Sequence, residues 1–137
     1  MLDNAIKFAS RVFNGRTDEK GEPYINHAMR VADKMETEFE KIVAVLHDVL
    51  EDTDCSIHDL QDAGFAREVI ECVEQLTRKS DFTYFEYIED IATSEVCKKV
   101  KLAELEDNQD IVRVNKLSFK TYSIEARCKK VREILGR

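Results

Sequence analysis

The amino-acid sequence predicts an all-α domain. Only four glycines and one proline occur in 137 residues, and Ala, Leu, Glu, Lys and Val are common, a composition typical of helical proteins. In most segments apolar residues recur every three or four positions, which is the period of amphipathic helices. A chain of this length is expected to form one domain, covering residues 1–137, with a core of its own.

The first part of the chain contains two amphipathic segments joined by a polar loop. Apolar residues between Asp3 and Phe13 occupy one face of a predicted helix. The loop NGRTDEKG follows, and it carries Arg16 and Lys20 among acidic residues. A second helix is expected to start at Glu22-Pro23-Tyr24, with the proline in its first turn. His27 lies near the start of that helix.

The third predicted helix, from about Glu38 through Leu50, contains the most unusual stretch of the chain, IVAVLHDVLEDT. Seven of the first nine residues of this stretch are apolar, which indicates burial on most sides. A buried ionisable pair is costly unless it is compensated, and a metal ion is one compensator. In a continuous helix, His47 and Glu51 share one face, with Asp48 and Asp52 beside it.

Two interpretations of this stretch stay open from the residues alone. In the first, His47 is a core histidine bonded to a carboxylate, and Glu51 and Asp52 are ordinary solvated residues. In the second, the acidic residues bind a cation. The second is favoured because the helix macrodipole disfavours acidic side chains at a helix C-terminus, where Asp48, Glu51 and Asp52 are expected to lie.

The second half of the chain predicts five more helices. Ser56 and Asp59 have capping-box spacing at the start of a short helix that ends at Gly64. Further helices are expected at residues 65–77, 83–92, 94–111 and 122–135. In the 94–111 segment Glu104 and Asn108 lie four residues apart and share a face, with Lys101 one turn earlier. The alternative for this segment is an exposed charged face.

Charge and cysteine usage exclude several classes of protein. The net charge of −7 argues against a nucleic-acid-binding protein. No apolar run approaches the roughly 20 residues that span a bilayer, so no membrane partner is expected. The four cysteines form no C-x-x-C pair and follow no signal peptide, which predicts reduced thiols in a cytoplasmic protein. Homo-oligomerisation stays open.

Five stretches, in order and with matching spacing, resemble one protein family. They are GEPYINH at residues 21–27, RVA at 30–32, AVLHDVLEDT at 44–53, DLQDAGF at 59–65 and VKLAELEDN at 100–108. Together they resemble the HD-domain metal-dependent phosphohydrolases, in the ppGpp-hydrolase branch of the RelA/SpoT type and its small stand-alone relatives. The resemblance implies a compact helical bundle with a central metal site.

The resemblance also implies residue roles. The family's metal ligands correspond to His27, His47, Asp48 and Glu104. Its Glu-Asp pair, which orients or activates the attacking water, corresponds to Glu51 and Asp52, and its substrate-contacting Asn corresponds to Asn108. The family usually holds Mn²⁺. Two imidazoles with carboxylates also suit Fe²⁺ or Zn²⁺ better than Ca²⁺.

The expected activity is hydrolysis of a small nucleotide, with removal of the 3′-pyrophosphate of ppGpp as the leading reaction and the 2′-phosphate of NADPH as another site of attack. Lys101, Arg16 and Lys20 are candidates for neutralising the substrate phosphates. The chain departs from the family in carrying Glu104 where relatives have Asp, and Asp18-Glu19 where relatives often carry cations. These departures motivate the alternative, a non-catalytic nucleotide-sensing or protein-binding module with a degenerate site.

Overall fold

The computed structural model describes residues 1–17, 21–114 and 129–136, with the side chains of residues 108–114 left out of the description. The described part confirms the all-α prediction, since its one β feature is an isolated bridge between Thr17 and Pro23. The helices are α1 Leu2–Val12, α2 Ile25–Asp33, α3 Glu38–Leu46, α4 Val49–Asp52, α5 Ile57–Asp62, α6 Arg67–Gln75, α7 Tyr84–Ile91 and α8 Glu95–Val114. Residues 129–135 are also helical, within the predicted 122–135 segment, whose first part lies outside the described residues.

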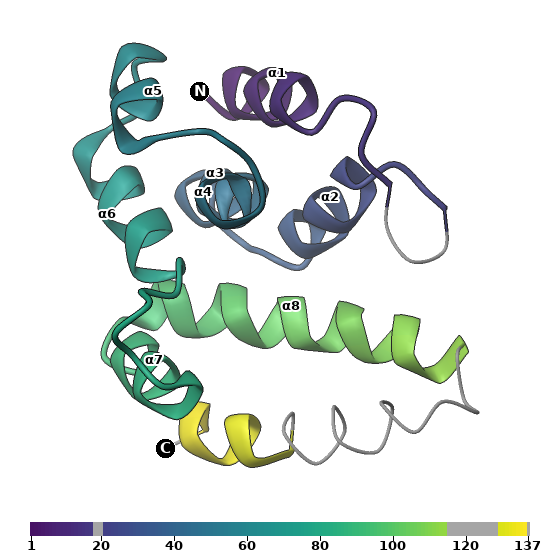
Figure 1. Cartoon of the computed structure of the whole chain (residues 1–137), viewed down its shortest axis with the longest axis vertical. Coiled ribbons are helices and arrows are strands. Elements are labelled where there is room, and N and C mark those ends of the chain that lie inside the picture. Colours follow the sequence, from purple (N-terminus) through teal and green to yellow (C-terminus); the bar gives the residue numbers. More distant parts are fainter. Residues whose placement is uncertain (18–20, 115–128, 137) are drawn as a thin grey trace.

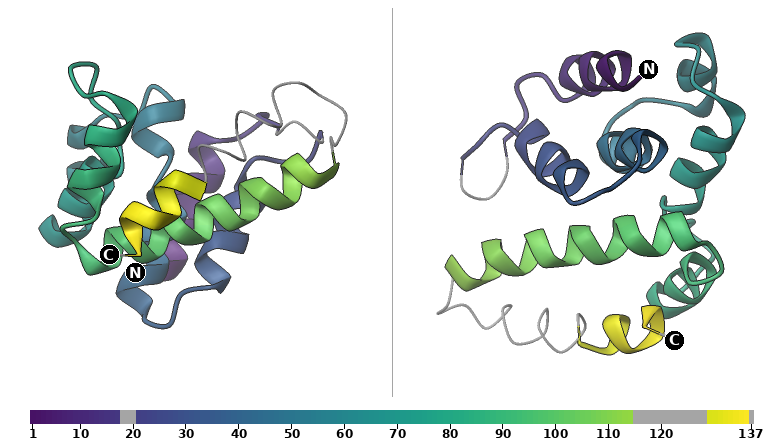
Figure 2. Two further views of the ribbon diagram at one scale, coloured as in Figure 1. Left: turned by 90° about the horizontal axis from the view of Figure 1, so that it is seen from below. Right: turned by 180° about the vertical axis from the view of Figure 1, so that it is seen from behind.

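Helix α3 is the centre of the fold. It packs against α1, α2, α6 and α8. In Figure 1 it is seen nearly end-on, with α1 above it, α2 to its right and α8 running across below. Figure 2 shows the same arrangement from two other sides. Ile42 is 6% exposed and Val43 to Leu46 are fully buried, because the neighbouring helices surround the C-terminal half of α3. The apolar run that the sequence contains is therefore the core of the protein.

The prediction of one continuous helix from Glu38 to Leu50 was wrong at His47 and Asp48. These two residues form a turn between α3 and α4. In an uninterrupted helix the carbonyl of Ala44 would accept the amide of Asp48. Here that carbonyl accepts the His47 amide at 3.4 Å and the His47 ring Nδ1 at 2.5 Å. The histidine therefore ends α3 by occupying the acceptor that the next turn would need.

Capping boxes mark where three of the helices begin. Ser56 and Asp59 form the predicted box at α5, with both side-chain-to-amide bonds present. Thr37 with Glu40 at α3, and Thr83 with Glu86 at α7, form the same arrangement. Each box pairs amides that would otherwise lack a partner at the helix start.

Pro23 lies outside the first turn of α2, contrary to the prediction. The helix begins at Ile25, and Tyr24 precedes it. Pro23 instead pairs with Thr17 in the isolated bridge, and the Tyr24 amide donates to the Arg16 carbonyl at 3.0 Å. This pairing brings the two ends of the polar loop together, and α2 begins only after it, at Ile25.

Two further sequence expectations concern the cysteines and the membrane. Cys55, Cys72 and Cys97 form no disulfide among the described residues, and Cys128 lies outside the described residues. Among the described helices, none combines the length and the apolar character needed to cross a bilayer.

Candidate metal centre

Four side chains from three parts of the fold converge in the centre of the bundle. His27 comes from α2, His47 and Asp48 from the turn between α3 and α4, and Glu104 from α8. Each contributes one potential ligand atom, and these atoms all lie within 4.8 Å of one another. The structure therefore brings together all four residues that the sequence nominated as metal ligands, and these four are called the cluster below.

Asp48 lies between the two histidines. Its Oδ2 is 3.0 Å from His47 Nε2 and 3.6 Å from His27 Nε2. Glu104 Oε2 is 3.9 Å from the same Nε2 of His47. His27, His47 and Asp48 are each at most 6% exposed, so water competes little for these groups.

His47 carries an unpartnered buried nitrogen. Its Nδ1 donates to the Ala44 carbonyl, which leaves Nε2 directed at the cluster without a hydrogen bond of acceptable geometry, even though Asp48 is close. A buried polar atom without a partner costs free energy, and an imidazole nitrogen is a common metal ligand. The donor set of two imidazole nitrogens and two carboxylates therefore fits a divalent transition-metal ion.

The electrostatics of the cluster favour a bound cation. Burial lowers the pKa of His47, but the negative charges of Asp48 and Glu104 outweigh it and raise this pKa to about 9. Burial raises the pKa of Asp48, but His47 outweighs it and lowers this pKa to about 2. In the absence of a metal ion, a proton on His47 therefore supplies the positive charge that a bound ion would supply.

Lys101 is buried next to Glu104. The residue is 7% exposed. Its Nζ lies 3.0 Å from Glu104 Oε2 and 5.2 Å from the centre of the Tyr87 ring. Burial lowers the pKa of Lys101, but Glu104 and two tyrosines outweigh it and hold this pKa above its usual value. Lys101 therefore stays charged at neutral pH and shares the Glu104 carboxylate with the cluster.

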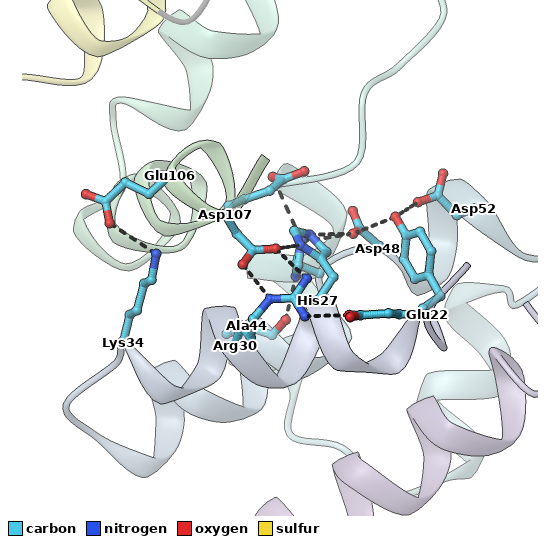
Figure 3. A network of polar contacts seen from close by, with 12 residues as sticks. Glu22, His27, Arg30, Lys34, Ala44, Asp48, Asp52, Glu106 and Asp107 are labelled. Atoms are coloured by element: carbon cyan, nitrogen blue, oxygen red, sulfur yellow. Dashed lines mark hydrogen bonds and ion pairs between the residues drawn. The ribbon is translucent and has the colours of Figure 1, made fainter. Parts of the chain in front are cut away.

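Glu51 and Asp52 lie on α4 at the exposed edge of the cluster. Partial burial raises the pKa of both carboxyl groups, and the charge of Asp48 adds to the effect. The Tyr24 hydroxyl donates to Asp52 Oδ2 at 2.8 Å and also lies 3.2 Å from Asp48 Oδ2. Figure 3 labels these two aspartates. Tyr24 thereby connects α2 to both acidic residues.

The candidate phosphate-binding residues are only partly described. A guanidinium nitrogen of Arg16, Nη1, donates to the backbone carbonyl of Asp52, which brings this cation to the edge of the cluster. Lys20 and the side chain of Asn108 lie outside the described part. Their proposed contacts with substrate stay predictions.

Sequence reasoning assigned no role to Asp107, Arg30 or Tyr24. Asp107 follows Glu104 by three residues on α8, and Arg30 follows His27 by three residues on α2, so each lies one turn from a candidate ligand. Burial raises the pKa of Asp107, but hydrogen bonds from Arg30 and His27 outweigh it and lower this pKa. Helical spacing from the predicted ligands was the available signal for the first two residues.

Comparison with known proteins agrees with this geometry. Residues 5–129 match the sequence profile of the HD domain. The chain is 31% identical over 127 residues to the bifunctional (p)ppGpp synthase/hydrolase SpoT of Escherichia coli, a match covering 90% of this chain and 17% of that protein. It is 36% identical over 110 residues to the guanosine-3′,5′-bis(diphosphate) 3′-pyrophosphohydrolase of Vibrio cholerae, covering 77% of this chain and 15% of that protein.

A solved structure has the same helical fold. It is that of a metazoan ortholog of SpoT that hydrolyses ppGpp and plays a role in starvation responses, and it matches with a TM-score of 0.83 and 26% identity over 98% of this chain and 84% of that one. The chain spans less than a fifth of the length of the two curated relatives named above. From the profile, the bacterial relatives and the shared helical fold, the chain belongs to the HD-domain family.

Proposed function

We propose that this chain is a metal-dependent phosphohydrolase that removes the 3′-pyrophosphate of ppGpp or a phosphate from a related nucleotide. The observation that carries the proposal is the buried convergence of His27, His47, Asp48 and Glu104, with His47 Nε2 unpartnered among them. Relatives that hydrolyse ppGpp support the choice of substrate. We further propose that residues 1–137 act as one hydrolase domain in the cytoplasm.

The four converging side chains would hold the ion, and Mn²⁺ is the proposed one, with Fe²⁺ or Zn²⁺ as alternatives suited to the same donors. When bound, such an ion acidifies water and withdraws charge from a phosphoryl oxygen. His47 can donate a lone pair only from Nε2, because Nδ1 is committed to the Ala44 carbonyl.

One of two carboxylates at the edge of the cluster would accept the proton of the attacking water. The raised pKa values of Glu51 and Asp52 bring these bases closer to neutral pH, which favours proton acceptance in general base catalysis. Tyr24 occupies one Asp52 oxygen and so orients that carboxylate. Arg16, which is fixed on the Asp52 carbonyl, is suited to neutralise a substrate phosphate. Lys20 and Asn108 are proposed to contact the nucleotide as well.

The test is pyrophosphate and phosphate release from ppGpp, NADPH, GTP and dNTPs, with Mn²⁺ and with EDTA. We expect pyrophosphate from ppGpp only with Mn²⁺, and loss of turnover in Asp48→Asn with the fold retained. Asp54→Asn is the matched control, because Asp54 is an exposed acid in the following loop and outside the cluster. Release from another nucleotide would change the substrate. Metal binding with no release from any would contradict catalysis and favour a binding module.

A further inference from the structure

The two ring nitrogens of His27 have different surroundings. Nε2 lies 3.6 Å from Asp48 Oδ2, on the side of the cluster. Nδ1 lies 2.6 Å from Asp107 Oδ2, on the opposite side of the ring (Figure 3). Because an ionised carboxylate accepts hydrogen bonds only, Nδ1 must carry the hydrogen in this contact. The lone pair of a neutral His27 then resides on Nε2, facing the other candidate ligands.

Arg30 holds the Asp107 carboxylate from the other side. Its Nε donates to Asp107 Oδ1 at 2.6 Å, and its Nη2 donates to Oδ2 at 3.0 Å. Asp107 is 4% exposed, so these contacts with Arg30 and His27 replace most of its hydration. Arg30 and His27 both lie on α2, while Asp107 lies on α8. The three side chains therefore set how α2 presents His27 to the cluster.

We infer that Asp107 is a positioning residue, which Arg30 fixes in place and which holds His27 in the tautomer whose Nε2 lone pair faces the metal centre. The inference deepens the proposed function and rests on it, since it assigns a role toward the same centre. Carboxylate–histidine–metal arrangements of this kind orient the ring and increase the basicity of the ligand nitrogen.

The arrangement requires a carboxylate and not merely a polar side chain. Asp107 receives three donors, two from Arg30 and one from His27. In Asp107→Asn, one of the two oxygen positions becomes an NH₂ group. If the NH₂ group faces His27, it donates to Nδ1 and moves the ring hydrogen to Nε2, where it blocks a metal. If the NH₂ group faces Arg30, two donors meet at the position where Nε and Oδ1 are now 2.6 Å apart.

The neighbouring residue provides a matched control. Glu106 is exposed, and its Oε2 lies 3.3 Å from Lys34 Nζ, so it also connects α8 to α2 (Figure 3). Among the described residues, Glu106 forms no hydrogen bond or ion pair with His27. Glu106→Gln removes an interhelical ion pair one residue away without changing the tautomer of His27.

The first measurement is the Mn²⁺ affinity, determined from the electron paramagnetic resonance signal of free Mn²⁺. The four proteins are wild type, Asp107→Asn, Glu106→Gln and the double variant Asp107→Asn/Arg30→Met, each shown to be folded by circular dichroism. We expect Asp107→Asn to weaken binding by about tenfold to a hundredfold, the range for loss of such a partner. Glu106→Gln should bind like wild type. Adding Arg30→Met to Asp107→Asn removes the competing donors, lets the amide oxygen turn to His27 Nδ1, and should recover about tenfold of the affinity.

The second measurement reads the tautomer directly, by ¹⁵N NMR of the histidine rings in metal-free protein at alkaline pH. We expect the His27 hydrogen on Nδ1 in wild type and in Glu106→Gln, and on Nε2 in Asp107→Asn. This readout needs neither metal nor turnover, so it decides the inference even if the chain hydrolyses no nucleotide or if Asp107→Asn does not fold.

Three results would overturn the inference. One is a wild-type His27 that carries its hydrogen on Nε2. Another is an Asp107→Asn protein that binds Mn²⁺ as tightly as Glu106→Gln does. The third is a double variant that binds no better than the Asp107→Asn single variant, because a merely structural role of Asp107 predicts no recovery when a second interhelical partner is removed.

Discussion

Replacing Lys101 with Met should remove the ion pair that Glu104 forms within the protein and leave the Glu104 carboxylate free to interact with the metal ion. Lys101 is 7% exposed, its Nζ lies 3.0 Å from Glu104 Oε2, and the straight Met side chain occupies a similar volume. In the variant, Glu104 and Asp48 face each other's charge without this ammonium group. We therefore expect the metal-free variant to be less stable than wild type and the Mn²⁺-bound variant to recover much of the difference.

The magnitude follows from the ion pair. At an effective dielectric constant of about 20, unit charges separated by about 3 Å attract by roughly 5 kcal/mol. Part of this gain offsets the cost of burying the ammonium group, and loss of one partner from a buried pair typically costs about 3 kcal/mol or more. For a domain of 137 residues, a loss of about 3 kcal/mol lowers the Tm by about 10 °C.

The assay is thermal unfolding by circular dichroism, in EDTA and in saturating Mn²⁺, together with a Mn²⁺ titration. Because Mn²⁺ would stand in for the missing positive charge, its binding to the variant should be about tenfold tighter, and the Tm gap to wild type should shrink by about half. Lys34→Met is the control, since Lys34 pairs with Glu106 at the surface and a surface pair contributes about 1 kcal/mol at most. A Tm gap that is the same with and without Mn²⁺ would refute the reasoning.

Two other predictions concern His47 and Tyr24. The folded protein raises the pKa of His47 from 6.5 to about 9, so the protonated ring stabilises the metal-free fold fully below about pH 6.5, and this contribution is lost as the pH rises through 9. The Tm in EDTA should fall over that window while the Mn²⁺ affinity rises, because metal and proton compete for Nε2 of His47. Thermal melts and calorimetry at several pH values measure the two quantities. A Mn²⁺ affinity that is independent of pH would contradict the competition. Tyr24→Phe removes the hydroxyl that contacts Asp52 and Asp48, so we expect kcat to fall about tenfold with Mn²⁺ affinity nearly unchanged, measured as pyrophosphate release and Mn²⁺ titration. A variant with full kcat would leave Tyr24 without a role in orienting Asp52.

The helices could be predicted from the sequence because their signals are local. Apolar periodicity located the segments that became α1, α3, α6, α7 and α8, and the Ser56–Asp59 spacing marked the start of α5. His47 and Asp48 could be nominated from the residues, since ionisable groups inside an apolar run require a partner, whereas His27 and Glu104 were implied as ligands by the family resemblance. The structure places one potential ligand atom of each of the four within 4.8 Å of the others, and their role as metal ligands stays a prediction.

The break at His47 and Asp48 could not be predicted from periodicity. It depends on the rotamer of the His47 ring, whose Nδ1 takes the Ala44 carbonyl, and a rotamer is selected by the side chains packed around it. The position of Pro23 likewise depends on its pairing with Thr17 across the loop. Both are contacts that a window of neighbouring residues does not contain.

The sequence by itself determined the helical class, most helix starts and the residue types able to hold a metal, because composition, period and capping act over a few neighbouring positions. Only the tertiary structure decided which groups share a carboxylate. His27 meets Asp107 across 80 positions of the chain. Lys101 lies one helical turn from Glu104 on α8, and it is the packing of α8 that buries this local pair next to Tyr87 of α7. Such pairings are set by how buried helices pack, since removing water from a charged group makes its nearest partner decisive.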